Sequence, residues 1–271
     1  MVELKRGKGP LDAVRILDRQ RMELRNGIGG TAEQARDAFL LNVQVLDAHL
    51  AQALGGWSWQ ERLYSTRYRL IFSGQADGLH LATMINAEVS YLDHWLSELT
   101  AALRVYVEED EAADPTALRA VLDTNVYLHY HLFAEVDWSG ALGRPGPVRI
   151  ITPMVVLREL DQQKNVGRKP ANQQARRVLR RLQELLEGGG RGPVPIGDGQ
   201  TVEVARDLPG HVPHPVADEE LLDRVEGFEG RPGGDLVLAT GDLSMRIRAG
   251  VRGLRTVMVA DTYRLEDHPA S

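Results

Sequence analysis

Apolar positions in the first part of the chain recur at three- and four-residue steps, which is the spacing of amphipathic helices. One such face carries Phe39, Val43, Leu46 and Leu50. Thr31 and Gln34 form a capping-box pattern directly before it. A second long helix, continuous or broken, is predicted over residues 79–109, and the acidic, proline-terminated segment 110–115 is typical of a linker. We therefore predict an all-α N-terminal domain over residues 1–115.

From residue 116 onward, short apolar runs alternate with helical patterns. The strands that these runs predict are 119–123, 148–153, 201–205, 235–242 and 255–261. Helices are predicted from Met154, after Ala217 and from Leu243, the first with Thr152 as its cap and Pro153 at its first position. This alternation indicates βαβ units and a parallel sheet, so residues 116–271 are predicted to form an α/β domain. The glycine-rich segment 188–200 is predicted to be a loop.

Composition excludes several kinds of chemistry. The 271 residues include no cysteine, which excludes disulfides, cysteine-bound zinc and thiol catalysis. The chain contains no G-x-x-x-x-G-K-[ST] phosphate loop and no apolar run of the roughly 18–20 residues that a membrane span needs. The N-terminus lacks the apolar core of a secretory signal. We therefore expect a cytoplasmic protein without a membrane partner.

Two aspartates occupy equivalent positions in the predicted sheet. Asp123 ends one apolar run and Asp242 follows another, and parallel sheets bind their ligands outside the carboxyl ends of their strands. Each aspartate could instead cap the helix that follows it. Because carboxylates gathered at one edge repel one another, they call for a divalent cation, either Mg²⁺ or Mn²⁺. A metal at this edge points to phosphodiester chemistry.

Two further acids are candidates for the same site. Glu159 lies at the edge of the buried face of the helix from Met154, and its alternative is a surface glutamate beside Arg158. Asp218 opens the helix after Ala217, where an acid is also favourable for the helix dipole. Its rivals in the same helix are Glu219, Glu220 and Asp223. We predict that Asp123, Glu159, Asp218 and Asp242 form the catalytic and metal-binding set.

Residues near these acids are candidates for contacts with a substrate phosphate. They are the small polar residues Thr124, Asn125 and Ser244 and the cations Arg158, Lys164, Arg168 and Arg246. Three of these cations, Arg158, Lys164 and Arg168, belong to a cationic segment between residues 158 and 181. Such a segment can follow a nucleic-acid backbone, although a solvated helix face is an equally good interpretation. The net charge of −6 does not by itself favour a nucleic-acid partner.

The motifs VLDTNVYL, ITPMVVLRELDQQK, ADEELL and LVLATGDLSMRIRAGVRGL resemble, in this order, those of a PIN domain. The motif sequences are most similar to those of the PIN modules of PhoH-type proteins and of RNA-decay endonucleases. The resemblance covers residues from about 119 to 264. The resemblance implies a three-layer α/β/α fold with a central parallel sheet. It also implies metal-dependent cleavage of single-stranded RNA, with the acidic quartet at the four positions given above.

Three functions remain open from the sequence. We expect an endoribonuclease that hydrolyses single-stranded RNA, with DNA as a further substrate. A PIN module that binds RNA or protein without catalysis is the alternative, and a DNA flap or repair nuclease is a less favoured one. The helical residues 1–115 are expected to support a homodimer or to bind a partner protein.

Overall fold

The computed structural model describes residues 3–26, 28–55, 59–75, 78–166, 168–188, 192–208 and 211–265. The chain divides into two compact units, which are described separately. Unit 1 comprises Met1–Val107 with Leu208–Val212, and unit 2 comprises Glu108–Asp207 with Pro213–Ser271. Across the described residues, no helix is both long enough and apolar enough to cross a membrane.

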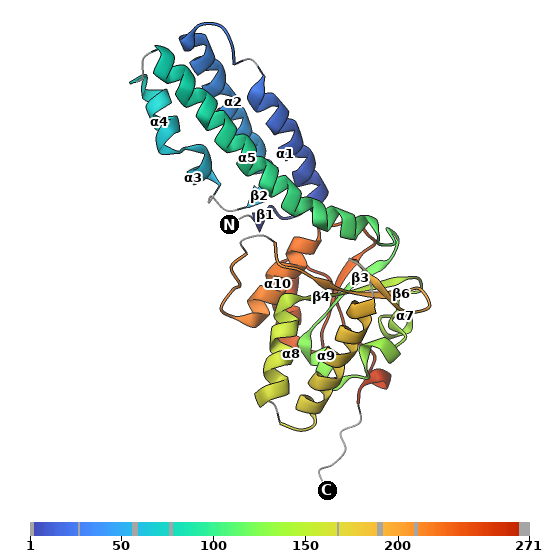
Figure 1. Ribbon diagram of the computed structural model, residues 1–271. Helices are drawn as coiled ribbons and strands as arrows, with labels where there is room; N and C mark the ends of the chain where they lie inside the picture. Colours follow the sequence, from blue (N-terminus) through green and yellow to red (C-terminus); the bar gives the residue numbers. More distant parts are fainter. Residues whose placement is uncertain are drawn as a thin grey trace. The chain divides into compact units, whose positions relative to one another are not determined.

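Unit 1 is built mainly from helices (Figure 1). Its elements are β1 (Glu3–Leu4), α1 (Pro10–Arg25), α2 (Ala32–Ala53), β2 (Leu54–Gly55), α3 (Gln60–Leu63), α4 (Thr66–Ser73) and the greater part of α5 (Gly78–Glu111). The predicted capping box at the start of α2 is confirmed. Thr31 accepts a hydrogen bond from the Gln34 amide at 3.3 Å, and the Gln34 side chain accepts one from the Thr31 amide at 2.9 Å.

The core of unit 1 follows the predicted helical face. Phe39, Val43 and Leu50 on α2 are fully buried, and they belong to one cluster with Leu17 of α1 and Leu96 of α5. Burying each such side chain stabilises the fold by about 1.5–3 kcal/mol. The long helix is continuous from Gly78 to Glu111.

Unit 2 contains a central six-stranded sheet. Its strands are β3 (Leu118–Leu122), β4 (Val148–Pro153), β5 (Val194–Gly197), β6 (Gln200–Ala205), β7 (Leu236–Ala239) and β8 (Thr256–Val257). They are ordered β5-β6-β4-β3-β7-β8, and all neighbours are parallel except β5 and β6. Every residue of β3 and β4 is buried, as expected for strands that are covered on both faces.

Helices complete unit 2. They are α6 (Thr124–His129), η1 (Phe133–Glu135), α7 (Trp138–Ala141), α8 (Met154–Val166), α9 (Ala171–Gly188), α10 (Ala217–Phe228), α11 (Leu243–Val251) and η2 (Asp261–Tyr263). Helices α8 and α9 pack side by side (Figure 1). The predicted architecture is confirmed: a three-layer α/β/α fold with a mostly parallel sheet, in a chain that begins with a helical region.

The strand order creates a switch point between β3 and β7. After β3 the chain continues to β4 and β6 on one side, and it then returns through α10 to β7 and β8 on the other side. Consecutive connections therefore leave β3 and β7 in opposite directions. At such a switch point, parallel sheets bind their ligands in the crevice outside the carboxyl ends of the strands. The Asp123 amide donates to the Ala239 carbonyl at 3.0 Å, so the two strand ends remain paired up to this crevice.

Two local predictions in unit 2 are wrong. Thr152 does not cap α8, because it is a fully buried β4 residue whose hydroxyl lies 2.6 Å from the Tyr127 hydroxyl. The predicted loop 188–200 contains strand β5 and the first residue of β6, while its residues 189–191 lie outside the described chain. Asp198 and Gly199 form the two-residue turn between these strands, where Gly199 adopts a φ of +68°.

A cluster of buried ion pairs lies in the same unit. Arg149 Nη2 is 3.0 Å from Asp110 Oδ1 and 2.7 Å from Glu203 Oε2. The Nε atom of Arg231 is 2.7 Å from Asp110 Oδ1, and its Nη1 atom is 3.0 Å from Glu203 Oε1. All four side chains are at least nine-tenths buried. Two cations therefore balance two anions, which is the condition under which buried charge is tolerated.

Candidate metal centre

Asp123 lies where β3 ends and α6 begins. It is 5% exposed, and its Oδ2 atom accepts a hydrogen bond from the Thr240 hydroxyl at 2.7 Å. Burial raises the pKa of Asp123, the Thr240 hydrogen bond lowers it, and the nearby Asp218 raises it further. No described residue forms an ion pair with this carboxylate.

Thr240 connects the ends of the two central strands. Its fully buried hydroxyl donates to Asp123 and accepts a hydrogen bond from the Asp242 amide at 3.1 Å. Thr240 therefore fixes the Asp123 carboxylate relative to the backbone that carries Asp242. Thr240 was not among the predicted site residues, although its position between an apolar strand and a glycine-aspartate pair could have indicated it.

Glu159 reaches the same crevice from the second turn of α8. Its Oε2 atom accepts a hydrogen bond from the Thr124 hydroxyl at 2.6 Å. Burial raises the pKa of Glu159, Thr124 lowers it, and the nearby carboxylates of Asp123 and Asp218 raise it further. Thr124 is itself buried, so in this structure its hydroxyl orients Glu159.

Asp218 approaches from the first turn of α10. It is close enough to raise the pKa values of Asp123 and Glu159 by charge repulsion. Its side chain is 49% exposed, and its Oδ2 atom lies 2.5 Å from Nη2 of Arg248 on α11. Asp218 is thus the one member of this group of three acids that has a cationic partner among the described residues.

The rivals of Asp218 have other partners. Glu219 pairs with Arg248 and Arg252, and Asp223 pairs with Arg252 at 2.6 Å. Glu220 is buried and accepts a hydrogen bond from the His214 amide at 2.7 Å. Asp218, by contrast, raises the pKa values of both Asp123 and Glu159 by charge repulsion, which favours Asp218 as the third acid.

Asp242 has a different environment from the other three acids. It is exposed and caps α11, where its Oδ1 atom accepts hydrogen bonds from the amides of Ser244 at 2.7 Å and Met245 at 3.2 Å. The capping interpretation is therefore correct for this residue. Capping uses one carboxylate oxygen, and the Thr240 hydrogen bond keeps the Asp242 backbone beside Asp123.

The donor set fits a hard divalent cation. Asp123 and Glu159 are acids with raised pKa values that face Asp218 and receive hydrogen bonds from hydroxyl groups, and Mg²⁺ and Mn²⁺ prefer carboxylate oxygens. The spacing is open. Within the described part of the chain, no three of the four acids bring carboxylate oxygens to within 4.8 Å of one another.

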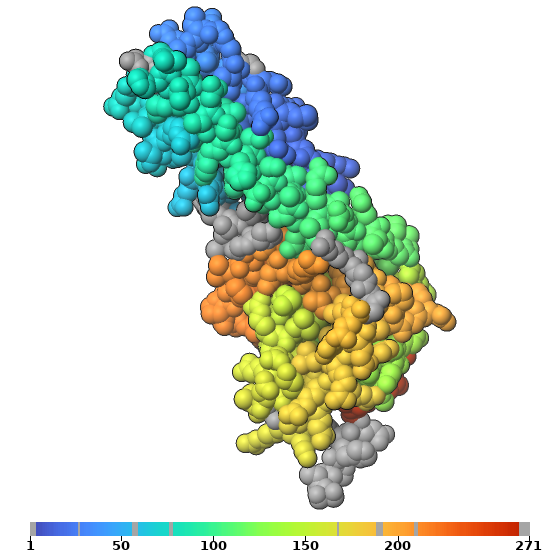
Figure 2. Space-filling model, in the orientation of Figure 1, coloured from blue at the N-terminus to red at the C-terminus, as the bar shows by residue number. Residues whose placement is uncertain are grey.

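The predicted phosphate contacts fall into two groups. Three cations are already engaged: Arg158 pairs with Asp207 at 2.6 Å, Lys164 pairs with Asp161 at 2.5 Å, and Arg246 donates to the Met258 sulfur at 3.4 Å. The exposed predicted contacts are Asn125, Arg158, Arg168 and Ser244, whereas Thr124 is buried. Figure 2 shows α8 and α9, in yellow to gold, on the surface of unit 2.

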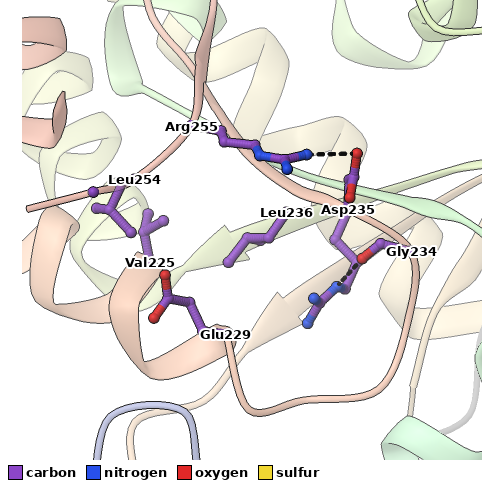
Figure 3. A pocket seen from close by; sticks show the side chains of 9 residues that line it. Val225, Glu229, Gly234, Asp235, Leu236, Leu254 and Arg255 are labelled. Carbon is purple, nitrogen blue, oxygen red and sulfur yellow. Dashed lines mark hydrogen bonds and ion pairs between the residues drawn. The ribbon is translucent and has the colours of Figure 1, made fainter.

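A separate cavity of about 290 Å³ lies at the opposite end of the sheet (Figure 3). Its lining includes Arg119 and residues that directly precede β7 and β8, among them Asp235 and Arg255, which form an ion pair at 2.8 Å. These residues lie at the amino ends of their strands. The cavity is therefore not part of the acidic crevice.

Unit 2 is thus a mostly parallel α/β/α domain with acids at the carboxyl ends of its two central strands. The PIN domain family model matches residues 120–260, and the chain belongs to this family. PIN domains are usually metal-dependent nucleases. The family assignment confirms the resemblance seen in the sequence.

A solved structure, described as a domain of a functionally unknown protein from Methanocaldococcus jannaschii DSM 2661, is similar at 16% identity. The similarity covers 56% of this chain and 96% of that chain, with a TM-score of 0.34. No curated protein matches the chain.

Proposed function

We propose that the chain is a divalent-metal-dependent endoribonuclease that hydrolyses single-stranded RNA. The observation that carries this proposal is the environment of Asp123 and Glu159. Both carboxylates have raised pKa values, both receive hydrogen bonds from hydroxyl groups, and neither has an ion-pair partner among the described residues. Without a cation, carboxylates that repel one another do not stabilise the fold. They do provide ligands for Mg²⁺ or Mn²⁺.

Some residues would bind the metal ion, and others would orient the carboxylates that bind it. Asp123 and Glu159 would supply the most buried oxygens, and Asp218 and Asp242 would complete the set directly or through water. Thr240 and Thr124 would keep the first two carboxylates in place through their hydrogen bonds. A bound divalent ion activates water at neutral pH and stabilises charge on a phosphate.

The substrate would lie across the crevice, with its phosphates near exposed polar groups. The proposed contacts that are exposed are Asn125, Arg158, Arg168 and Ser244. Of the proposed cations, Arg158, Lys164 and Arg246 would have to leave their present partners. Single-stranded RNA is the proposed substrate, with single-stranded DNA as a further one. The proposed compartment is the cytoplasm, and unit 1 is proposed to mediate homodimer formation or to bind a partner protein.

One observation favours a second function, a PIN module that binds RNA or protein without cutting. Arg248 neutralises Asp218, which leaves fewer acids available for a cation. A cleavage assay separates the two functions. The full chain is incubated with labelled single-stranded RNA and DNA in Mn²⁺, Mg²⁺ or EDTA, beside the variant Asp123→Asn.

The proposal predicts cleavage that needs the metal and that falls at least about a hundredfold in Asp123→Asn. Asp198→Asn is the matched control, because it makes the same change in the exposed turn between β5 and β6. This control should retain its activity. Cleavage that persists in EDTA and in Asp123→Asn contradicts the metal mechanism, and RNA binding without any cleavage supports the non-catalytic module.

A further inference from the structure

Arg248 is the only described cation that contacts one of the four proposed site acids. Its guanidinium spans two acids in the first turn of α10: Nη2 lies 2.5 Å from Asp218 and Nη1 lies 2.8 Å from Glu219. A guanidinium can hold two carboxylates at once because its N–H groups point in fixed, divergent directions. Arg248 is thus attached to one site acid and to one acid outside the site.

We propose that Arg248 is an exchangeable counterion. It neutralises Asp218 in the metal-free protein, releases this carboxylate to the divalent cation, and then offers its free N–H groups to a phosphate of the single-stranded substrate. This inference rests on the proposed function. It adds a residue that couples occupation of the metal site to substrate binding.

The release of Asp218 requires little rearrangement. The side chains of Arg248 and Asp218 are 31% and 49% exposed, and ion pairs with such exposure are weak. Asp218 also feels the negative charges of Asp123 and Glu159. A divalent cation among these three acids carries two positive charges, whereas the guanidinium of Arg248 carries one. The cation therefore competes effectively for Asp218.

Glu219 keeps Arg248 beside the site after the exchange. Its carboxylate holds Nη1 of Arg248, while the neighbouring Arg252 is supported by Asp223 at 2.6 Å as well as by Glu219. The Nε atom of Arg248 is buried and has no acceptor among the described residues. The guanidinium is therefore not fully hydrogen-bonded. Arg248 therefore keeps its place on the surface while Nη2 changes partner.

The alternative is a permanent ion pair that holds α10 against α11 and orders Asp218. The two readings predict opposite effects on metal affinity. If Arg248 competes with the metal, its removal tightens metal binding. If Arg248 orders Asp218, its removal weakens metal binding.

The test measures Mn²⁺ binding to the full chain by calorimetry without RNA, followed by the cleavage kinetics. The variants are Arg248→Met and Arg248→Lys, with Arg252→Met as the matched control. Arg252 caps the carboxyl end of the same helix, and its ion pairs join Glu219, Asp223 and Glu226. Both methionine variants change the net charge equally, so a difference between them reports the contact with Asp218.

We expect Arg248→Met to bind Mn²⁺ about three- to tenfold more tightly than the wild type. Its KM for RNA should rise about tenfold, with a smaller change in kcat, because a phosphate contact is lost. Arg248→Lys should restore most of the KM, and Arg252→Met should change neither quantity more than about twofold.

Two results overturn the inference alone: weaker Mn²⁺ binding by Arg248→Met, or equal Mn²⁺ affinities for Arg248→Met and Arg252→Met. A different result overturns the proposed function and the inference together. That result is a wild-type Mn²⁺ affinity that Asp123→Asn leaves unchanged. The two failures are therefore distinguishable in one set of titrations.

Discussion

Unit 2 buries charge in two regions and treats it in opposite ways. At the carboxyl ends of β3 and β7, Asp123 is buried beside other acids and receives a hydrogen bond from a hydroxyl group. In the second region, Arg149 and Arg231 lie between Asp110 and Glu203, so that each charge has opposite partners. The comparison shows that buried charge alone does not mark a functional site. The feature that distinguishes the candidate site is that Asp123 and Glu159 have no ion-pair partner among the described residues.

The ion-pair cluster gives the largest expected change in stability. Arg149→Met should lower the free energy of unfolding by about 3–5 kcal/mol, because Asp110 and Glu203 would remain buried with Arg231 as their shared cation. Urea unfolding measures this change. The control Arg144→Met removes an exposed pair with Asp235 and should cost less than about 1 kcal/mol. Equal losses in the two variants would show that burial of the cluster has no special importance.

Thr240→Val tests the acidic region with an intermediate effect. The substitution keeps the shape of the side chain and removes the hydroxyl that donates to Asp123. We expect kcat to fall about tenfold or more, since groups that orient a metal ligand have effects of this size. The pKa of Asp123 should rise further, so the acidic limb of the pH–rate profile should move to higher pH. Thr256→Val on β8 serves as the control, and an unchanged profile in Thr240→Val contradicts the orienting role.

The pH dependence of stability gives a smaller effect with a defined sign. Because folding raises the pKa values of Asp123 and Glu159, the folded protein binds protons more readily than the unfolded chain. Their ionisation therefore destabilises the fold as the pH rises through the interval between the unfolded and folded pKa values. Without metal, Asp123→Asn should gain stability relative to the wild type at neutral pH. This gain should disappear as the pH falls below the ordinary aspartate range, which urea unfolding at a series of pH values can measure.

The sequence was sufficient where the decisive signals are local. Asp123 directly follows β3, Asp242 comes three residues after the end of β7, and the capping box at Thr31 lies next to the helix that it starts. These features depend on neighbouring residues, so periodicity and capping patterns reveal them. The same holds for the parallel sheet, whose strands appear as short apolar runs between helical patterns.

The missed features depend on contacts between distant parts of the chain. Arg248 and Asp218 are 30 positions apart, and Arg231 and Asp110 are 121 positions apart. No local pattern states which arginine will pair with which acid, because the packing of the elements decides it. The prediction that Thr152 caps α8 was wrong for a related reason. A threonine before a proline suits both a helix cap and a strand end, and β4 extends through Pro153.

The central claim is that the acids at the carboxyl ends of β3 and β7 destabilise the fold until a divalent cation joins them. Urea unfolding at neutral pH, in EDTA and then in excess Mn²⁺, tests this claim for the wild type and Asp123→Asn. In EDTA the variant should be at least as stable as the wild type. Mn²⁺ at a hundred times its Kd should stabilise the wild type by about 2.7 kcal/mol and leave the variant almost unchanged. A variant that is less stable in EDTA, together with a wild type that does not respond to Mn²⁺, would contradict the claim.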